Sequence, residues 1–163
     1  MSKFKIGYGE DIHRLVKGRK LFLGGIEIES ELGLLGHSDA DVVIHALMDS
    51  LLGASGKGDI GVYFPPDDPA FENADSKQLL RQIVSLIKND GYEIGNVDIA
   101  ITAEKPKLKS YIPLMINCLS SILCIDASDI NIQAMTNEGL DSLGESKAIR
   151  AVAICLLERT NNE

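Results

Sequence analysis

The sequence contains little that would mark a secreted, membrane-spanning or disulfide-stabilised protein. It has no tryptophan, and its three cysteines show no CxxC spacing, which argues against a disulfide framework or a zinc knuckle. No apolar run approaches the roughly 20 residues that a membrane span needs. The first residues, MSKFKIGYGEDIH, lack the apolar core of a signal peptide. We therefore expect a cytoplasmic protein with reduced cysteines.

Positive charge is also scarce. Lys and Arg number 16 against 24 Asp and Glu, which gives a formal net charge of −8 at pH 7. Nucleic acids and anionic membranes require a basic surface, so neither is expected as a partner. An acidic protein that handles a phosphate ester must supply positive charge locally, and bound metal ions are the usual source.

Length and composition are those of one ordinary globular domain. The 163 residues are 45% hydrophobic and 25% charged, and no linker or low-complexity tract divides them. We predict a single catalytic domain, residues 1–163, of the α/β or α+β kind.

Hydrophobic periodicity and turn residues predict the secondary structure. We expect strands at 3–8, 96–103 and 129–135, two short strands within 20–28 around a Gly-Gly turn, and helices at 38–52, 76–90, 110–123 and 145–158. The Gly- and Pro-rich stretch 53–71 is predicted to be a functional loop. Strict alternation at 97–101 and 130–134 indicates a sheet with helices on one face and polar surroundings or another subunit on the other.

Histidines and carboxylates gather near the start of the chain. Asp11 and His13 are two residues apart in an extended segment, so their side chains point to the same side. His45 shares one stripe of an otherwise apolar helix with Asp41 and Asp49. Such buried groups need polar partners or a metal.

Two imidazoles and one carboxylate with an open position match the ligand set of catalytic zinc. Asp41 or Asp49 could orient His45 through its second ring nitrogen. The same ligands suit an iron facial triad, and satisfied core and surface residues are the other alternative.

Two more polar groups follow predicted strands. Lys107 and Lys109 lie in a loop after Pro106, and Thr136 and Glu138 follow strand 129–135. Loops beyond strand ends often bind ligands, so these side chains could hold phosphates and a second metal. The alternative is a pair of solvated loops.

Segments along almost the whole chain resemble the 2-C-methyl-D-erythritol 2,4-cyclodiphosphate synthase family. They are GYGEDIH, LGGIEI, GLLGHSDADVVIHALMDSLLGA, GDIGVYFPPDDPAF, ADSKQLL, GYEIGNVDIAI, EKPKL, INIQAMTNEGL and AIRAVA. The patterns HSDAD-x4-H and GDIG-x2-FP are hallmarks of that family. The resemblance implies an α+β fold with a mixed four-stranded sheet, a small hairpin and helices on one face, assembled as a homotrimer with active sites between subunits.

The implied activity is that of a phosphorus-oxygen lyase of non-mevalonate isoprenoid biosynthesis. It converts 4-diphosphocytidyl-2-C-methyl-D-erythritol 2-phosphate into the 2,4-cyclodiphosphate and CMP, as the 2-phosphate attacks the β-phosphorus. Positioning and charge neutralisation would supply the catalysis.

The resemblance also implies roles for individual residues. Zinc would be bound by Asp11, His13 and His45, and a second ion, Mg²⁺ or Mn²⁺, by Glu138. His37 and Thr136 would be catalytic. The substrate would be bound by Ser38, Asp59, Ile60, Gly61, Phe64, Asp68, Ala103, Pro106, Lys107, Leu108, Lys109, Ala134 and Met135.

Four positions depart from the family pattern. Met135 replaces a common threonine, Pro66 a frequent aspartate, and Ser142 and Glu145 an aromatic residue and an arginine. Two competing functions remain open: a phosphoesterase that uses zinc-bound hydroxide and releases inorganic phosphate, and a binding module with structural zinc, which would need a fourth protein ligand.

Overall fold

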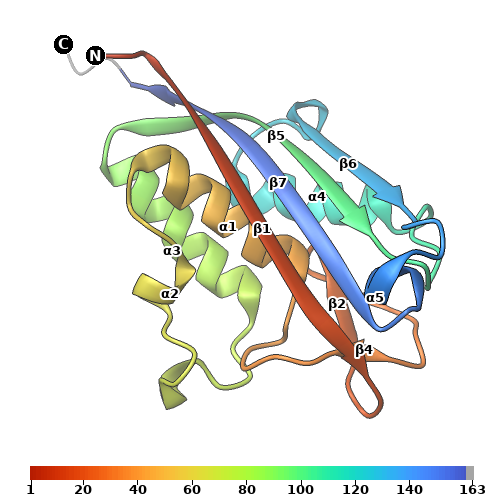
Figure 1. The fold of residues 1–163 in the computed structure, drawn as a ribbon. Coiled ribbons are helices and arrows are strands. Elements are labelled where there is room, and N and C mark those ends of the chain that lie inside the picture. Colours follow the sequence, from red (N-terminus) through yellow and green to blue (C-terminus); the bar gives the residue numbers. More distant parts are fainter. Residues whose placement is uncertain (161–163) are drawn as a thin grey trace.

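A five-stranded sheet with the order β4-β1-β7-β5-β6 forms one layer of the structure, and the longer helices cover one of its faces (Figure 1). The computed structural model describes residues 1–160. β5 and β6 run parallel, and the other neighbouring pairs are antiparallel. The strands of this mixed sheet are β1 (Phe4–Val16), β4 (Gly33–Leu34), β5 (Tyr92–Thr102), β6 (Ile130–Met135) and β7 (Ala148–Arg159).

A separate two-stranded hairpin is formed by β2 (Leu21–Leu23) and β3 (Ile26–Ile28), as predicted. Gly24 and Gly25 make its turn with φ values of 60° and 80°. Residues with a Cβ adopt such values only at a cost, which explains the Gly-Gly pair.

Three helices carry most of the helical layer: α1 (Val42–Ser55), α3 (Ser76–Asn89) and α4 (Ile112–Leu123). The predicted helices at 76–90 and 110–123 are confirmed, with Pro113 in the first turn of α4. Short helices α2 (Ile60–Tyr63) and α5 (Asp141–Gly144) and 3-10 turns at Pro69–Phe71 and Ala127–Asp129 complete the set. Within residues 1–160, no helix has the length and apolar character needed to cross a membrane.

The predicted helix 38–52 is displaced along the chain. Asp41, and not Ser38, is its N-cap, because the Asp41 carboxylate accepts a hydrogen bond from the N–H of Ile44. The helix passes Gly53 and ends at Gly56, which has a φ of 74° and provides the left-handed cap. The predicted loop 53–71 is interrupted by α2, whose N-cap is Asp59.

The prediction of a helix at 145–158 was wrong. These residues form β7, which lies between β1 and β5 and is hydrogen-bonded on both sides. Both of its faces are at least partly covered, so its sequence, AIRAVAICLLER, is apolar almost throughout and lacks the alternation of a half-exposed strand. The main sheet therefore has five strands and not four.

The hydrophobic core lies between the sheet and the helices. Side chains of α1 are buried nearly all round, as predicted. The face of the sheet turned away from the helices is instead exposed, and it is largely apolar along β1 and at Ile154 of β7. Its exposed fractions are 48% for Phe4, 75% for Ile6, 57% for Tyr8, 51% for Ile12 and 46% for Ile154.

Candidate metal centre and substrate cavity

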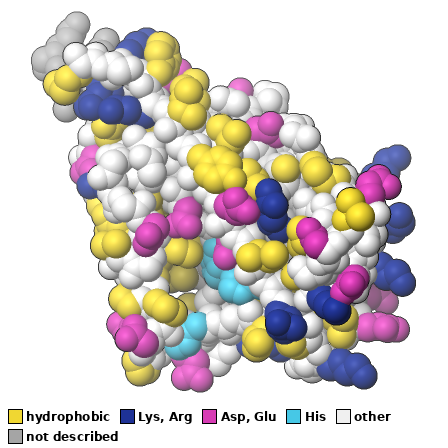
Figure 2. Space-filling view, viewed as in Figure 1, with side chains coloured by type: hydrophobic (Ala, Val, Ile, Leu, Met, Phe, Trp, Pro, Cys, Tyr) yellow, Lys and Arg dark blue, Asp and Glu magenta, His cyan; other side chains and the backbone are white. Residues whose placement is uncertain are grey.

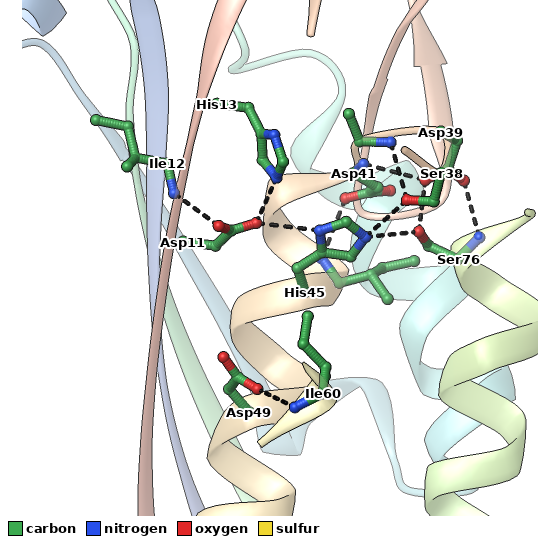
Figure 3. A network of polar contacts seen from close by, with 12 residues as sticks. Asp11, Ile12, His13, Ser38, Asp39, Asp41, His45, Asp49, Ile60 and Ser76 are labelled. Atoms are coloured by element: carbon green, nitrogen blue, oxygen red, sulfur yellow. Dashed lines mark hydrogen bonds and ion pairs between the residues drawn. The ribbon is translucent and has the colours of Figure 1, made fainter. Parts of the chain in front are cut away.

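Close packing of β1 on α1 brings the predicted metal ligands together. A Cβ added to Gly9 would lie 2.0 Å from the backbone oxygen of Ala46, so only glycine permits this approach. Two and four residues further along β1, Asp11 and His13 face the same side. His45, on the adjoining turn of α1, faces them (Figure 3).

The three side chains form one compact cluster. Oδ2 of Asp11 lies 2.8 Å from Nε2 of His13 and 3.0 Å from Nδ1 of His45. The possible ligand atoms all lie within 4.8 Å of one another. One carboxylate oxygen and two imidazole nitrogens on the wall of a cavity, with space beside them for a fourth ligand, suit a divalent metal ion of the zinc type.

The electrostatics of the cluster favour a bound cation. Burial alone would raise the pKa of Asp11, but hydrogen bonds from His13 and His45 outweigh it and lower that pKa to about 2. Burial would lower the pKa of His13, yet its contact with Asp11 raises it overall. The carboxylate is therefore ionised near neutral pH and stabilises positive charge on the two imidazole rings. A bound metal ion would take the place of the protons that supply this charge.

The backbone fixes the orientation of the His13 ring. Nδ1 of His13 lies 2.7 Å from the carbonyl oxygen of Leu35. A carbonyl oxygen only accepts hydrogen bonds, so Nδ1 carries a proton and donates it, and Nε2 is the nitrogen left for a metal.

Neither Asp41 nor Asp49 orients His45, which corrects the prediction. The buried carboxylate of Asp41 accepts hydrogen bonds from the N–H groups of Gly24, Gly25 and Ile44, joining the hairpin to the start of α1. Asp49 accepts a 2.8 Å hydrogen bond from the N–H of Ile60. Each carboxylate satisfies free backbone donors of a neighbouring segment, and their spacing along the helix could not reveal those donors.

A cavity of about 250 Å³ opens beside the cluster. Histidine side chains are visible in this hollow of the surface in Figure 2. Its apolar wall includes Met48, Phe71 and Leu79, which the sequence patterns did not single out. The predicted site residues that line it are Asp11, His13, His37, Ser38, His45, Ile60, Gly61 and Phe64.

The segment 59–75 covers one side of this cavity and is attached to His37. Nε2 of His37 donates a 2.9 Å hydrogen bond to the carbonyl oxygen of Asp68, and the N–H of Asn73 donates to the carbonyl oxygen of His37. Asp59 and Asp68 do not line the cavity in the structure. Their carboxylates cap α2 and the 3-10 turn at Pro69–Phe71.

A second cavity, of about 160 Å³, lies beyond the carboxyl ends of β5 and β6. Eight residues to which the resemblance gives a role line it, seven for substrate binding and Thr136 for catalysis. These residues are Ala103, Pro106, Lys107, Leu108, Lys109, Ala134, Met135 and Thr136. Within the single chain, most of the predicted site residues thus fall into two separate cavities, and Asp59, Asp68 and Glu138 line neither.

Glu104 lines the second cavity and was missed in the sequence. Its Oε1 accepts hydrogen bonds from the N–H groups of Asn137, at 2.9 Å, and Gly139, at 3.2 Å. Between them, Glu138 has a φ of 54°, an uncommon value for a residue with a side chain. Glu104 therefore helps to hold the loop that presents Glu138, although 34 residues separate the two in the sequence.

Comparison with known proteins agrees with this geometry. The model of the YgbB family matches residues 4–158. A 2-C-methyl-D-erythritol 2,4-cyclodiphosphate synthase from Synechococcus elongatus is 54% identical over 159 residues, 98% of this chain and 99% of that protein. IspF of Plasmodium falciparum, solved as a CDP complex, has a TM-score of 0.86 at 38% identity, with 99% of both chains covered. The bifunctional IspDF of Campylobacter jejuni has a TM-score of 0.92 at 36% identity, covering 96% of this chain and 42% of that one.

Proposed function

Since the chain belongs to the YgbB family, whose curated relatives are 2-C-methyl-D-erythritol 2,4-cyclodiphosphate synthases, we propose that it catalyses the same reaction. Its substrate is 4-diphosphocytidyl-2-C-methyl-D-erythritol 2-phosphate, and its products are the 2,4-cyclodiphosphate and CMP. The reaction is a phosphorus-oxygen lyase step of isoprenoid biosynthesis. The observation that carries this proposal is the cluster of Asp11, His13 and His45 on the wall of a cavity.

The chemistry is an intramolecular phosphoryl transfer. An oxygen of the 2-phosphate forms a bond to the β-phosphorus, and the bond from that phosphorus to the bridging oxygen of the α-phosphate breaks. CMP leaves with the bridging oxygen. Neither water nor a covalent enzyme intermediate is needed, so the protein has to fold the substrate back on itself and neutralise charge.

Asp11, His13 and His45 would hold zinc, which when bound supplies a Lewis acid for a phosphate oxygen. Glu138 would hold a second ion, Mg²⁺ or Mn²⁺, because a carboxylate is the ligand that such hard cations prefer. Glu138 is exposed and follows Thr136, which lines the second cavity, by two residues, and this position supports that role.

Side chains of the first cavity would bind the reacting groups. His37 has a ring on the cavity wall, and Ser38 has a hydroxyl beside His45, so both can reach a phosphate oxygen there. Ile60, Gly61 and Phe64 would enclose the methylerythritol part. Asp59 and Asp68 would contribute to this part of the site if the segment 59–75 shifts when the substrate binds.

The second cavity would bind the cytidine part. Lys107 and Lys109 can neutralise phosphate charge at its rim, and Thr136 would stabilise the transferred phosphoryl group. Ala103, Pro106, Leu108, Ala134 and Met135 would contact the base and ribose, largely through backbone groups.

A homotrimer would join the two groups of residues. One chain places them in separate cavities, and a neighbouring copy could set its second cavity against the first. The exposed apolar face of the sheet, which includes Ile6, Tyr8 and Ile154, supplies a surface for such an assembly.

The decisive test of function is incubation of the purified protein, zinc and Mg²⁺ with the cytidine diphospho substrate, followed by phosphorus NMR. We expect CMP and the cyclic diphosphate in equal amounts. Release of inorganic phosphate without the cyclic product would instead identify a phosphoesterase.

A further inference from the structure

A chain of hydrogen bonds extends from Nε2 of His45, the ring nitrogen that does not face Asp11, to the carboxylate of Asp39 outside the cavity. While Nδ1 of His45 faces Asp11, Nε2 lies 3.1 Å from Oγ of Ser38 and 3.1 Å from Oγ of Ser76 (Figure 3). Ser76, the first residue of α3, is completely buried. Oγ of Ser76 is in turn hydrogen-bonded to Oδ1 of Asp39.

The direction of these bonds follows from the chemistry of the groups. An ionised carboxylate only accepts hydrogen bonds, so the hydroxyl proton of Ser76 points to Asp39. Ser76 then presents only lone pairs to Nε2 of His45, and a bare Nε2 there would be repelled. Ser38 imposes no direction, because its hydroxyl can donate or accept. The arrangement therefore favours a proton on Nε2 of His45. A metal ion would then bind at Nδ1, in place of the proton that Nδ1 donates to Asp11.

Asp39 is itself held firmly. Its Oδ2 accepts a 2.9 Å hydrogen bond from the N–H of Ser76, and its Oδ1 accepts one of 3.1 Å from the N–H of Asp41. The N–H of Asp39 donates to the carbonyl oxygen of Ala74. With donors on both oxygens, the carboxylate cannot turn away from Ser76 without losing backbone hydrogen bonds.

We propose that Asp39 is a positioning residue of the metal centre, acting through Ser76 to set the tautomer and orientation of His45. Histidine metal ligands commonly donate a hydrogen bond from the N–H of their second ring nitrogen to a carboxylate. Here a buried serine lies between the ring and the carboxylate. The inference rests on the zinc site of the proposed function and adds to it a contribution from the start of α3.

The test measures zinc affinity by competition with a chelator in Asp39→Ala and Ser76→Ala. Asp39→Ala frees the Ser76 hydroxyl to donate to Nε2 of His45. Ser76→Ala removes the hydroxyl oxygen that accepts from this nitrogen. We expect affinity to fall by about 10- to 100-fold in each. The Nε2–H proton of His45 should give a resolved NMR signal in the zinc-loaded wild type. This signal should be absent from the spectra of both variants.

Two matched controls separate this role from structural effects. Asp75→Ala removes the other carboxylate that caps α3, where it accepts from the N–H of Lys77. Ser50→Ala removes a buried hydroxyl of α1 that donates a hydrogen bond to the carbonyl oxygen of Leu47 and has no contact with His45. Both should keep wild-type zinc affinity and the NMR signal.

Several outcomes would overturn the inference. Unchanged zinc affinity and an unchanged Nε2–H signal in Ser76→Ala would do so, even if Asp39→Ala fails to fold. An equal loss of affinity in Asp75→Ala would assign the effect to helix capping. Failure of the wild type to bind zinc would instead refute the metal assignment of the proposed function, so the two failures are distinguishable.

Discussion

At the scale of single residues, His45 connects the metal cluster with the core. Its side chain is almost fully buried in α1, and Asp11 is its partner on the cavity side. We predict that His45→Ala lowers bound zinc to well below one ion per chain and abolishes turnover, because only two ligands remain. Metal analysis of the purified variant measures this.

The control for that change is His37→Ala. His37 lines the same cavity but does not belong to the three-residue cluster. This variant should lose activity and retain its zinc. Full zinc occupancy in His45→Ala would refute the ligand assignment.

Glu138 is the residue assigned to the second ion. We predict that Glu138→Gln keeps zinc but loses most activity, since an amide is a weaker ligand than a carboxylate for a hard cation. A magnesium titration of the steady-state rate tests this. Glu145→Gln, a change of the same kind in a nearby exposed residue, should behave as wild type. An identical magnesium dependence in wild type and Glu138→Gln would remove Glu138 from the mechanism.

The residues of the candidate metal cluster could be found in the sequence because a local pattern marks each of them. Asp11 and His13 share a face of one strand, and His45 is a polar residue in a helix that is otherwise apolar. Asp39, Ser76 and Glu104 could not be found in this way. Each acts through a partner more than 30 residues distant, and only the folded chain brings those partners together.

At the scale of elements, the contact between β1 and α1 determines where the ligands meet. We predict that Gly9→Ala destabilises the protein by about 3 kcal/mol, because the added Cβ overpacks this contact. Zinc affinity should fall too, since the shifted strand carries Asp11 and His13. Chemical denaturation and chelator competition measure the two effects.

Gly53→Ala provides a control in the same helix. A Cβ there has only the backbone oxygen of Tyr8 nearby, at 3.7 Å. Since alanine favours the helical conformation over glycine, we expect a gain of up to about 1 kcal/mol and unchanged zinc binding. A Gly9→Ala variant as stable as wild type would show that β1 can move away from α1 freely.

Elements differed in how well their sequences predicted them. α3 has a clear apolar stripe, with Leu80, Ile83 and Ile87 facing the core, and its bounds were nearly correct. β7 was mistaken for a helix because its central place in the sheet removes the alternation that identifies a strand. That place depends on pairing with β1 and β5, which local patterns do not contain.

At the scale of the whole molecule, the two cavities predict an active site shared between subunits. Asp59→Ala and Thr136→Ala chains, each inactive alone, should regain part of their activity when they are unfolded together and reassembled. Mixed trimers would contain some sites with neither change. Activity is measured against each variant reassembled by itself.

A mixed assembly as inactive as its parents would contradict shared sites or the assignment of these two residues. The oligomeric state, measured by sedimentation, shows whether trimers formed in the mixture. The sequence pointed to self-association only through the alternating strands 97–101 and 130–134, and it gave no means to choose the surface. The exposed apolar side chains of β1 form part of the surface that we propose for it.

The pairing of β1 with β7 also has a consequence for synthesis of the protein on the ribosome. Residues 11, 13 and 45 are synthesised early, but β1 cannot pair with β7 until residues 148–159 have been made. At translation rates of roughly 5 to 20 residues per second, the interval from residue 45 to residue 148 lasts about 5 to 20 seconds. During that time the apolar helix α1 lacks β7, one of the two strands that pack most closely on it. A nascent chain is therefore expected to need protection from aggregation before it can acquire its metal.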